Sequence, residues 1–94
     1  MRVTVLVPSV LRGDAGGAGS LDVTVDAAGK LGDLLDAVAE THPRLARRIR
    51  DEQGQIRRYV NVYVDGEESR HVGGVAAPLT DGGEVHVLPS VAGG

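Results

Sequence analysis

The sequence of 94 residues contains no cysteine, phenylalanine or tryptophan, and Lys30 is its single lysine. Without cysteine the chain can form no disulfide, and it offers neither a thiolate nucleophile nor a thiolate ligand for a metal. Its aromatic side chains are Tyr59 and Tyr63 alone. The hydrophobic core therefore has to be built from valine, leucine, isoleucine and alanine.

An excess of positive charge and long apolar runs are also missing. The formal net charge is −3 and the pI is near 5.5, which argues against nucleic acid as the main partner because phosphate binding needs a basic surface. No apolar run approaches the length of a membrane span, and residues 1–5 alternate like a strand rather than forming a signal peptide. We expect a single cytoplasmic domain whose partners include neither nucleic acid nor a membrane.

Alternating apolar residues predict strands, and one change of period predicts a helix. Leu31, Leu34, Leu35 and Val38 recur at helical spacing, and Pro43 prevents simple continuation of that helix beyond His42. A second short helical turn is expected over residues 44–50, with its arginines facing outward. Residues 12–20 are rich in glycine and predict a flexible hairpin loop. Strands are expected over residues 3–7, 21–25, 59–64 and 84–88, with a short edge strand over 68–72.

This order of elements predicts an α+β fold in which one main helix packs on one face of a mixed sheet, the β-grasp arrangement. We expect a domain over residues 1–90 and a flexible tail over residues 91–94. The alternation places valines of three strands on the helix side of the sheet. On the opposite side it predicts an exposed apolar patch that binds a partner, formed by Leu6, Tyr59, Tyr63, His86 and Leu88.

The last residues, Val91-Ala92-Gly93-Gly94, suggest a chemical handle. Glycine has no Cβ, so two in succession form the thinnest tail available. Such a tail can enter a narrow channel and bring its terminal carbonyl carbon to a nucleophile. The alternative is that it is simply a frayed terminus.

Several stretches together resemble the ubiquitin-like sulfur carriers of the ThiS/MoaD group, most of all the CysO-type carriers of actinobacterial cysteine biosynthesis. The resemblance spans nearly the whole chain and includes the terminal Gly93-Gly94. An additional arginine-rich segment over residues 44–58 supports the CysO-like subtype. The stretches are 3–12, 58–64, Gly73-Gly74 with Ala76, and 81–94.

The resemblance implies a carrier that is not itself an enzyme and binds no cofactor. An E1-like enzyme would use ATP to adenylate the Gly94 carboxylate, and a sulfur donor would convert it to a thiocarboxylate. Val91 and Ala92 would be held with the patch by that enzyme. A sulfur-accepting synthase and a product-releasing metalloprotease would act downstream, for cysteine or a related metabolite.

Other readings remain open. The chain could be the small subunit of a molybdopterin synthase, a protein modifier joined to lysines through Gly94, or an interaction module with an irrelevant tail. The arginines of residues 44–58 predict a solvated face or, as the alternative, a contact with an acidic partner. His42, His71 and His86 share no ligand spacing, so we expect no metal site.

Overall fold

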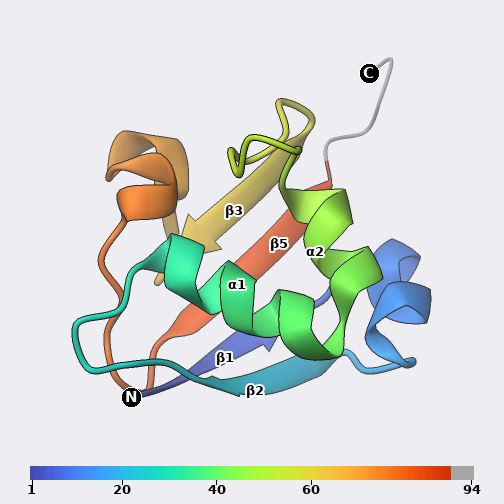
Figure 1. Cartoon of the computed structure of the whole chain (residues 1–94), viewed down its shortest axis with the longest axis horizontal. Helices are drawn as coiled ribbons and strands as arrows, with labels where there is room; N and C mark the ends of the chain where they lie inside the picture. Colours follow the sequence, from blue (N-terminus) through green and yellow to red (C-terminus); the bar gives the residue numbers. More distant parts are fainter. Residues whose placement is uncertain (90–94) are drawn as a thin grey trace.

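The computed structural model describes residues 1–89 and consists of a five-stranded sheet with helices packed on one face (Figure 1). The strands lie in the order β2-β1-β5-β3-β4. The central pair β1 and β5 is parallel and the other pairs are antiparallel, so the sheet is mixed as predicted. The strands are β1 (Arg2–Leu6), β2 (Ser20–Thr24), β3 (Val60–Val64), β4 (Glu67–Glu68) and β5 (Glu84–Pro89).

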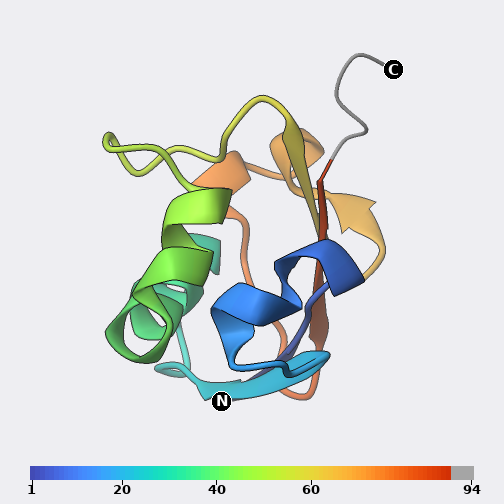
Figure 2. The same cartoon turned by 90° about the vertical axis from the view of Figure 1, so that its right-hand side faces the viewer.

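Two α-helices, α1 (Leu31–Thr41) and α2 (Pro43–Ile49), lie on the same side of the sheet (Figure 2). Helix α1 ends at Thr41 with His42 as its cap, and so does not continue beyond His42, as expected, because proline disfavours the helical conformation of the residue before it. The fixed φ of Pro43 then suits the first position of the next helix. The predicted second helical turn is confirmed, and the arrangement is the β-grasp fold.

The core lies between the sheet and these helices and contains no aromatic side chain. Its valines come from alternate positions of the three central strands, where each is at most 7% exposed. Leucines of α1 and α2 cover them. Burial of each such side chain stabilises the fold by about 1.5–3 kcal/mol relative to exposure. The valines on the helix side are Val3, Val5, Val7, Val60, Val62, Val64, Val85 and Val87, as the alternation predicts.

The prediction of a flexible loop over residues 12–20 is wrong for its first part. Residues Ser9–Ala15 form the 3₁₀ helix η1, which begins directly after Pro8. Leu11 and Ala15 are buried in the core, and burial of these two side chains orders a segment whose glycines suggest disorder. Only the turn after η1 needs glycine, since Gly16 and Gly17 have φ values of 66° and 88°.

The expected edge strand over residues 68–72 is also shorter than predicted. Strand β4 contains two residues and is followed by the 3₁₀ helix η2 (Ser69–His71) and then by η3 (Gly74–Ala76). The tight turn before β4 is present, with Asp65 and Gly66 both at positive φ as in the turns that favour Asp-Gly. The side chain of Asp65 also accepts a hydrogen bond of 2.8 Å from the Glu84 amide, which fixes the start of β5.

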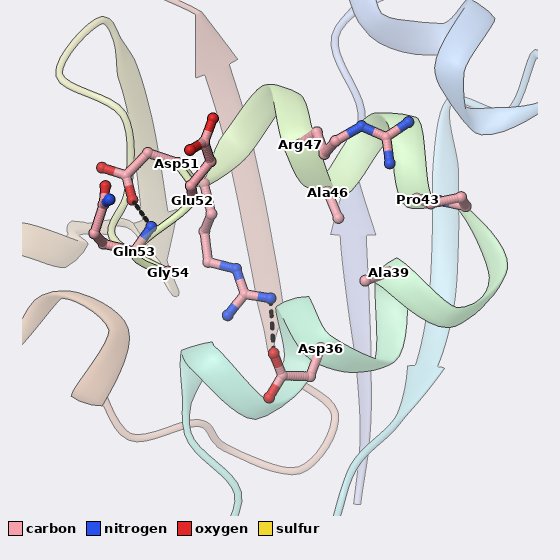
Figure 3. A pocket seen from close by; sticks show the side chains of 10 residues that line it. Asp36, Ala39, Pro43, Ala46, Arg47, Asp51, Glu52, Gln53 and Gly54 are labelled. Atoms are coloured by element: carbon pink, nitrogen blue, oxygen red, sulfur yellow. Dashed lines mark hydrogen bonds and ion pairs between the residues drawn. The ribbon is translucent and has the colours of Figure 1, made fainter.

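Arg50 does not face outward as predicted. Its side chain is only 16% exposed and turns back across α1, where Nη2 donates to Asp36 Oδ1 at 2.7 Å and Nη1 to the Gly32 carbonyl at 3.5 Å. A hollow of about 400 Å³ opens here between α1, α2 and the loop 51–54 (Figure 3). Asp51 shapes that loop by accepting from the amides of Gln53 and Gln55. The ion pair therefore acts as a brace between the two helices.

Candidate functional site on the outer face of the sheet

The site begins with the side of the sheet that no α-helix covers. We call this side, formed by Leu6, Tyr59, Tyr63, His86 and Leu88, the outer face. Tyr59 is 56% exposed and Leu88 is 37% exposed, which is unusual for large side chains with so much apolar surface. Leu6 and Tyr63 are half-buried, and His86 is exposed. The structure thus places Leu6, Tyr63, His86 and Leu88 on the side that the alternation predicts, whereas Tyr59 is exposed in the turn that precedes β3.

Strand register brings three of these residues into one row. Leu6 of β1 pairs with His86 of β5, and His86 pairs with Tyr63 of β3. Side chains directly opposite each other on one face of antiparallel strands lie about 4.5–5.5 Å apart at Cβ. His86 and Tyr63 consequently form a continuous surface with Leu6.

Leu88 and Tyr59 extend this surface toward the end of β5. Leu88 pairs with Asn61, and Tyr59 immediately precedes Val60, which pairs with Pro89. Pro89 is the last residue that the structure describes. The outer face therefore reaches the point from which the chain continues toward its C-terminus. The predicted site residues Val91, Ala92, Gly93 and Gly94, and with them the proposed tail, lie outside the described residues.

A shallow hollow of about 270 Å³ lies on the outer face. Its lining combines apolar side chains with the ionisable side chains of His86 and Glu84. Two of the lining residues, Gly66 and Glu84, were not predicted as site residues from the sequence. Alternation along the predicted strand 84–88 would have placed Glu84 beside His86 and Leu88, whereas Gly66 follows only from the turn after β3. The hollow is lined by Tyr63, Gly66, Glu84, His86 and Leu88.

Arg70 is a further residue that the sequence did not reveal. Its guanidinium donates from Nη2 to the carbonyls of Arg57 at 2.7 Å and Val60 at 2.8 Å, and from Nη1 to Asn61 Oδ1 at 3.2 Å. A planar guanidinium carries several N–H donors and can therefore donate to several acceptors at once. Arg70 thereby holds the start of β3, and the residues just before it, next to the end of β5.

The arginine-rich segment leaves the outer face open. Leu45 and Ile49 of α2 are fully buried in the core, so this helix packs on the opposite side of the sheet (Figure 2). Helix α2 of this segment therefore does not cover the apolar patch. An open surface of this kind is typical of a site for protein recognition.

Within residues 1–89 no group of three or more histidine, aspartate or glutamate side chains is arranged to hold a metal ion. Over the same residues no helix is both long and apolar enough to cross a membrane.

Comparison with known proteins identifies close relatives. The chain is 36% identical to the sulfur carrier protein CysO of Mycobacterium tuberculosis over 96 aligned residues, covering the whole of both chains. It is 40% identical over 70 residues to small archaeal modifier protein 3 of Haloferax volcanii, covering 74% of this chain and 75% of the relative.

Solved structures agree with these sequences. A chain in the crystal structure of the Amycolatopsis orientalis BexX/CysO complex superimposes with a TM-score of 0.85 at 36% identity, covering 98% of this chain and 99% of that one. The model of the ThiS family matches residues 5–94, and therefore includes the outer face and the final glycines. The chain belongs to the ThiS family of ubiquitin-like proteins.

Proposed function

We propose that this protein is a sulfur carrier whose C-terminal Gly94 carboxylate is the reactive group. The observation that carries the proposal is the identity of 36% with the sulfur carrier CysO along the whole of both chains. Such a carrier is a substrate of partner enzymes and needs no catalytic residue of its own. Its final product would be cysteine or a related sulfur-containing metabolite.

Activation of Gly94 would proceed in two steps on the partner enzyme. A carboxylate is a poor electrophile, so one of its oxygens first attacks the α-phosphate of ATP and displaces pyrophosphate. A sulfur donor at the oxidation level of hydrosulfide then attacks the carbonyl carbon of this acyl adenylate. AMP leaves with one of the original carboxylate oxygens, and the net change is replacement of oxygen by sulfur in a thiocarboxylate.

The outer face would be the surface by which an E1-like enzyme holds the carrier. Five residues follow Pro89, and five residues span at most about 18 Å even when fully extended. An enzyme that acts on Gly94 must therefore hold the domain within that distance of its reacting atoms. The outer face ends at Pro89 and combines apolar side chains with a hollow, which suits this task.

Further partners would use the same end of the chain. The thiocarboxylate has to reach a sulfur-accepting synthase, and release of the product from the carrier would require a hydrolase, for which a metalloprotease is the candidate. A relative has been crystallised in a complex, since the CysO of Amycolatopsis orientalis was solved together with BexX. By analogy, a folded partner protein would dock on this chain.

A variant with one alanine added after Gly94 tests the proposal. The addition moves the carboxylate away from the glycine pair, so we expect sulfur transfer to be lost while the thermal midpoint stays unchanged. The matched control is Ser90→Ala, which alters the segment after Pro89 but keeps the terminal glycines. Full sulfur transfer by the extended chain would refute the mechanism.

A second candidate function is protein modification, in which Gly94 forms an isopeptide bond with a lysine of a target. The 40% identity to small archaeal modifier protein 3 favours it. Peptides that carry a remnant of the C-terminal glycines on lysine, found by mass spectrometry in cells that express this chain, would support this function. The two roles share the activated carboxylate and differ in the nucleophile that attacks it.

A further inference from the structure

A second surface, distinct from the outer face, is formed by arginines of α2. Arg44, Arg47 and Arg48 project from this helix and, with Asp14 of η1, line a hollow of about 330 Å³. All three arginines are exposed. We call these four residues the basic hollow.

Arg44 is placed at a cost to the helix that carries it, whereas Arg47 and Arg48 lie in the last turn, where the helix dipole favours positive charge. Arg44 lies in the first turn of α2, where the helix dipole disfavours a positive charge, and that turn contains no acidic residue. Arg47 and Arg48 follow at i+3 and i+4, the spacings at which like charges repel. Local features that oppose stability are expected where a residue serves a function other than folding.

Among the described residues Asp14 is the one carboxylate that lines the basic hollow, although Arg47 also borders the hollow lined by Asp36, Asp51 and Glu52. Arg48 Nε lies 3.2 Å from Asp14 Oδ2, but neither Arg44 nor Arg47 forms an ion pair with any residue from 1 to 89. Residues 43–58 carry six arginines against Asp51 and Glu52, a net charge of +4. The whole chain carries −3, so the remaining residues carry −7. The arginine-rich segment therefore carries the opposite sign of net charge from the rest of the chain.

The basic hollow lies near the end of the sheet from which the C-terminal segment leaves. Strands β1 and β5 are parallel, and Leu6 pairs with His86, so both strands end on the same side. Helix η1, which contributes Asp14, follows directly after β1 and packs against α2. Figure 2 shows η1 and α2 next to each other. A partner that holds the outer face near Pro89 could extend around this end to the hollow.

We propose that the basic hollow binds an acidic protein surface, rich in aspartate and glutamate, on the enzyme that activates Gly94. The inference rests on the proposed function, because it takes that enzyme as the partner. A limited acidic patch is the fitting counterpart, since it meets the arginines without facing the rest of the molecule. A long polyanion such as nucleic acid would also meet the remaining charge of −7 and be repelled.

The first test measures association with the activating enzyme by stopped-flow fluorescence. At about 50 mM NaCl we expect Arg44→Glu/Arg47→Glu to lower the association rate roughly tenfold, and at about 500 mM NaCl by less than about twofold. The matched control is Arg2→Glu/Lys30→Glu, which changes the net charge equally at exposed positions outside the basic hollow. If the control slows association as much, net charge rather than this surface is responsible and the proposal fails.

Stability separates a binding role from a structural one. Arg44→Glu places a negative charge in the first turn of α2 and removes repulsion, so its thermal midpoint should be unchanged or raised by about 2 °C. Slower association by a variant that folds at least as well supports the proposal. A lower midpoint together with slower association would assign the arginines to folding instead.

A second measurement keeps the surface testable if the enzyme does not act on this chain. The ¹⁵N-labelled protein is titrated with a hexaglutamate peptide at low salt, and amide shifts are recorded. We expect the shifts to concentrate at residues 14 and 44–48 and to fall by more than about half in Arg44→Glu/Arg47→Glu. Shifts spread evenly over the molecule, or unchanged in the variant, would overturn the proposal. Failure of the enzyme to modify the wild-type chain would refute the proposed function alone.

Discussion

At the scale of single residues, neighbouring positions on two strands have opposite roles. Val62 of β3 is fully buried against the helices, whereas Leu88 of β5 is 37% exposed on the outer face. Val62 pairs with Val87, which is adjacent to Leu88 along β5. Neighbouring residues of β5 therefore point to opposite faces of the sheet. Because alternation is strict, a substitution on one face should affect stability and a substitution on the other should affect binding.

Val62→Asp should destabilise the protein severely. It places a charge in an apolar core where Val62 is 0% exposed, and we expect a loss of at least about 3 kcal/mol in the free energy of unfolding. Urea denaturation followed by circular dichroism measures the change. The matched control is Val10→Asp at a position 73% exposed, which should cost less than about 0.5 kcal/mol. A normal urea midpoint for Val62→Asp would contradict the structure of β3.

At the scale of elements, the regular pattern was predictable and the irregular segments were not. Alternation predicts the strands around Val62 and Val85, and helical spacing predicts α1, because burial on one face imposes a period. Helix η1 could not be predicted, since glycine-rich composition hides the few buried side chains that order it. The inward turn of Arg50 and the bonds of Arg70 depend on partners distant in sequence, which periodicity does not reveal.

In the candidate site, too, the residues on regular strands were predictable and those placed by turns were not. Alternation predicts the five residues of the outer face because it depends only on which side of a strand each residue occupies. The hollow additionally involves Gly66 and Glu84, whose places are fixed by the turn after β3 and by the pairing of β5. Strand order sets those neighbours, and a single sequence does not specify strand order.

The outer face as a unit should be needed for activation but not for folding. Leu88→Glu introduces a charge at the apolar surface near Pro89, so we expect at least about a tenfold loss in the rate of adenylation, with less than about 1 kcal/mol lost in stability. ATP–pyrophosphate exchange with the activating enzyme measures the rate. The control Ala28→Glu adds the same charge at an exposed position away from the outer face. Unfolding of Leu88→Glu would show that Leu88 belongs to the core.

At the scale of the whole molecule, the proposed function would separate recognition from chemistry. A small core of aliphatic side chains supports two surfaces. The outer face lies on one side of the sheet, and the basic hollow is lined by arginines of α2, the helix on the other side (Figure 2). The outer face runs along β5 as far as Pro89, and the basic hollow lies toward that same end of the sheet. This arrangement suits a carrier that a larger enzyme holds while acting on the terminal carboxylate, and it requires no catalytic group within the domain.

The most direct test of this account is the intact mass of the protein after incubation with ATP, a sulfide source and the activating enzyme. We predict a gain equal to the replacement of one oxygen by sulfur, which fragmentation assigns to the C-terminal peptide that ends in Gly94. Omission of ATP should abolish the gain. An unchanged mass with an enzyme that modifies a related carrier in a parallel reaction would contradict the assignment of this chain as a sulfur carrier.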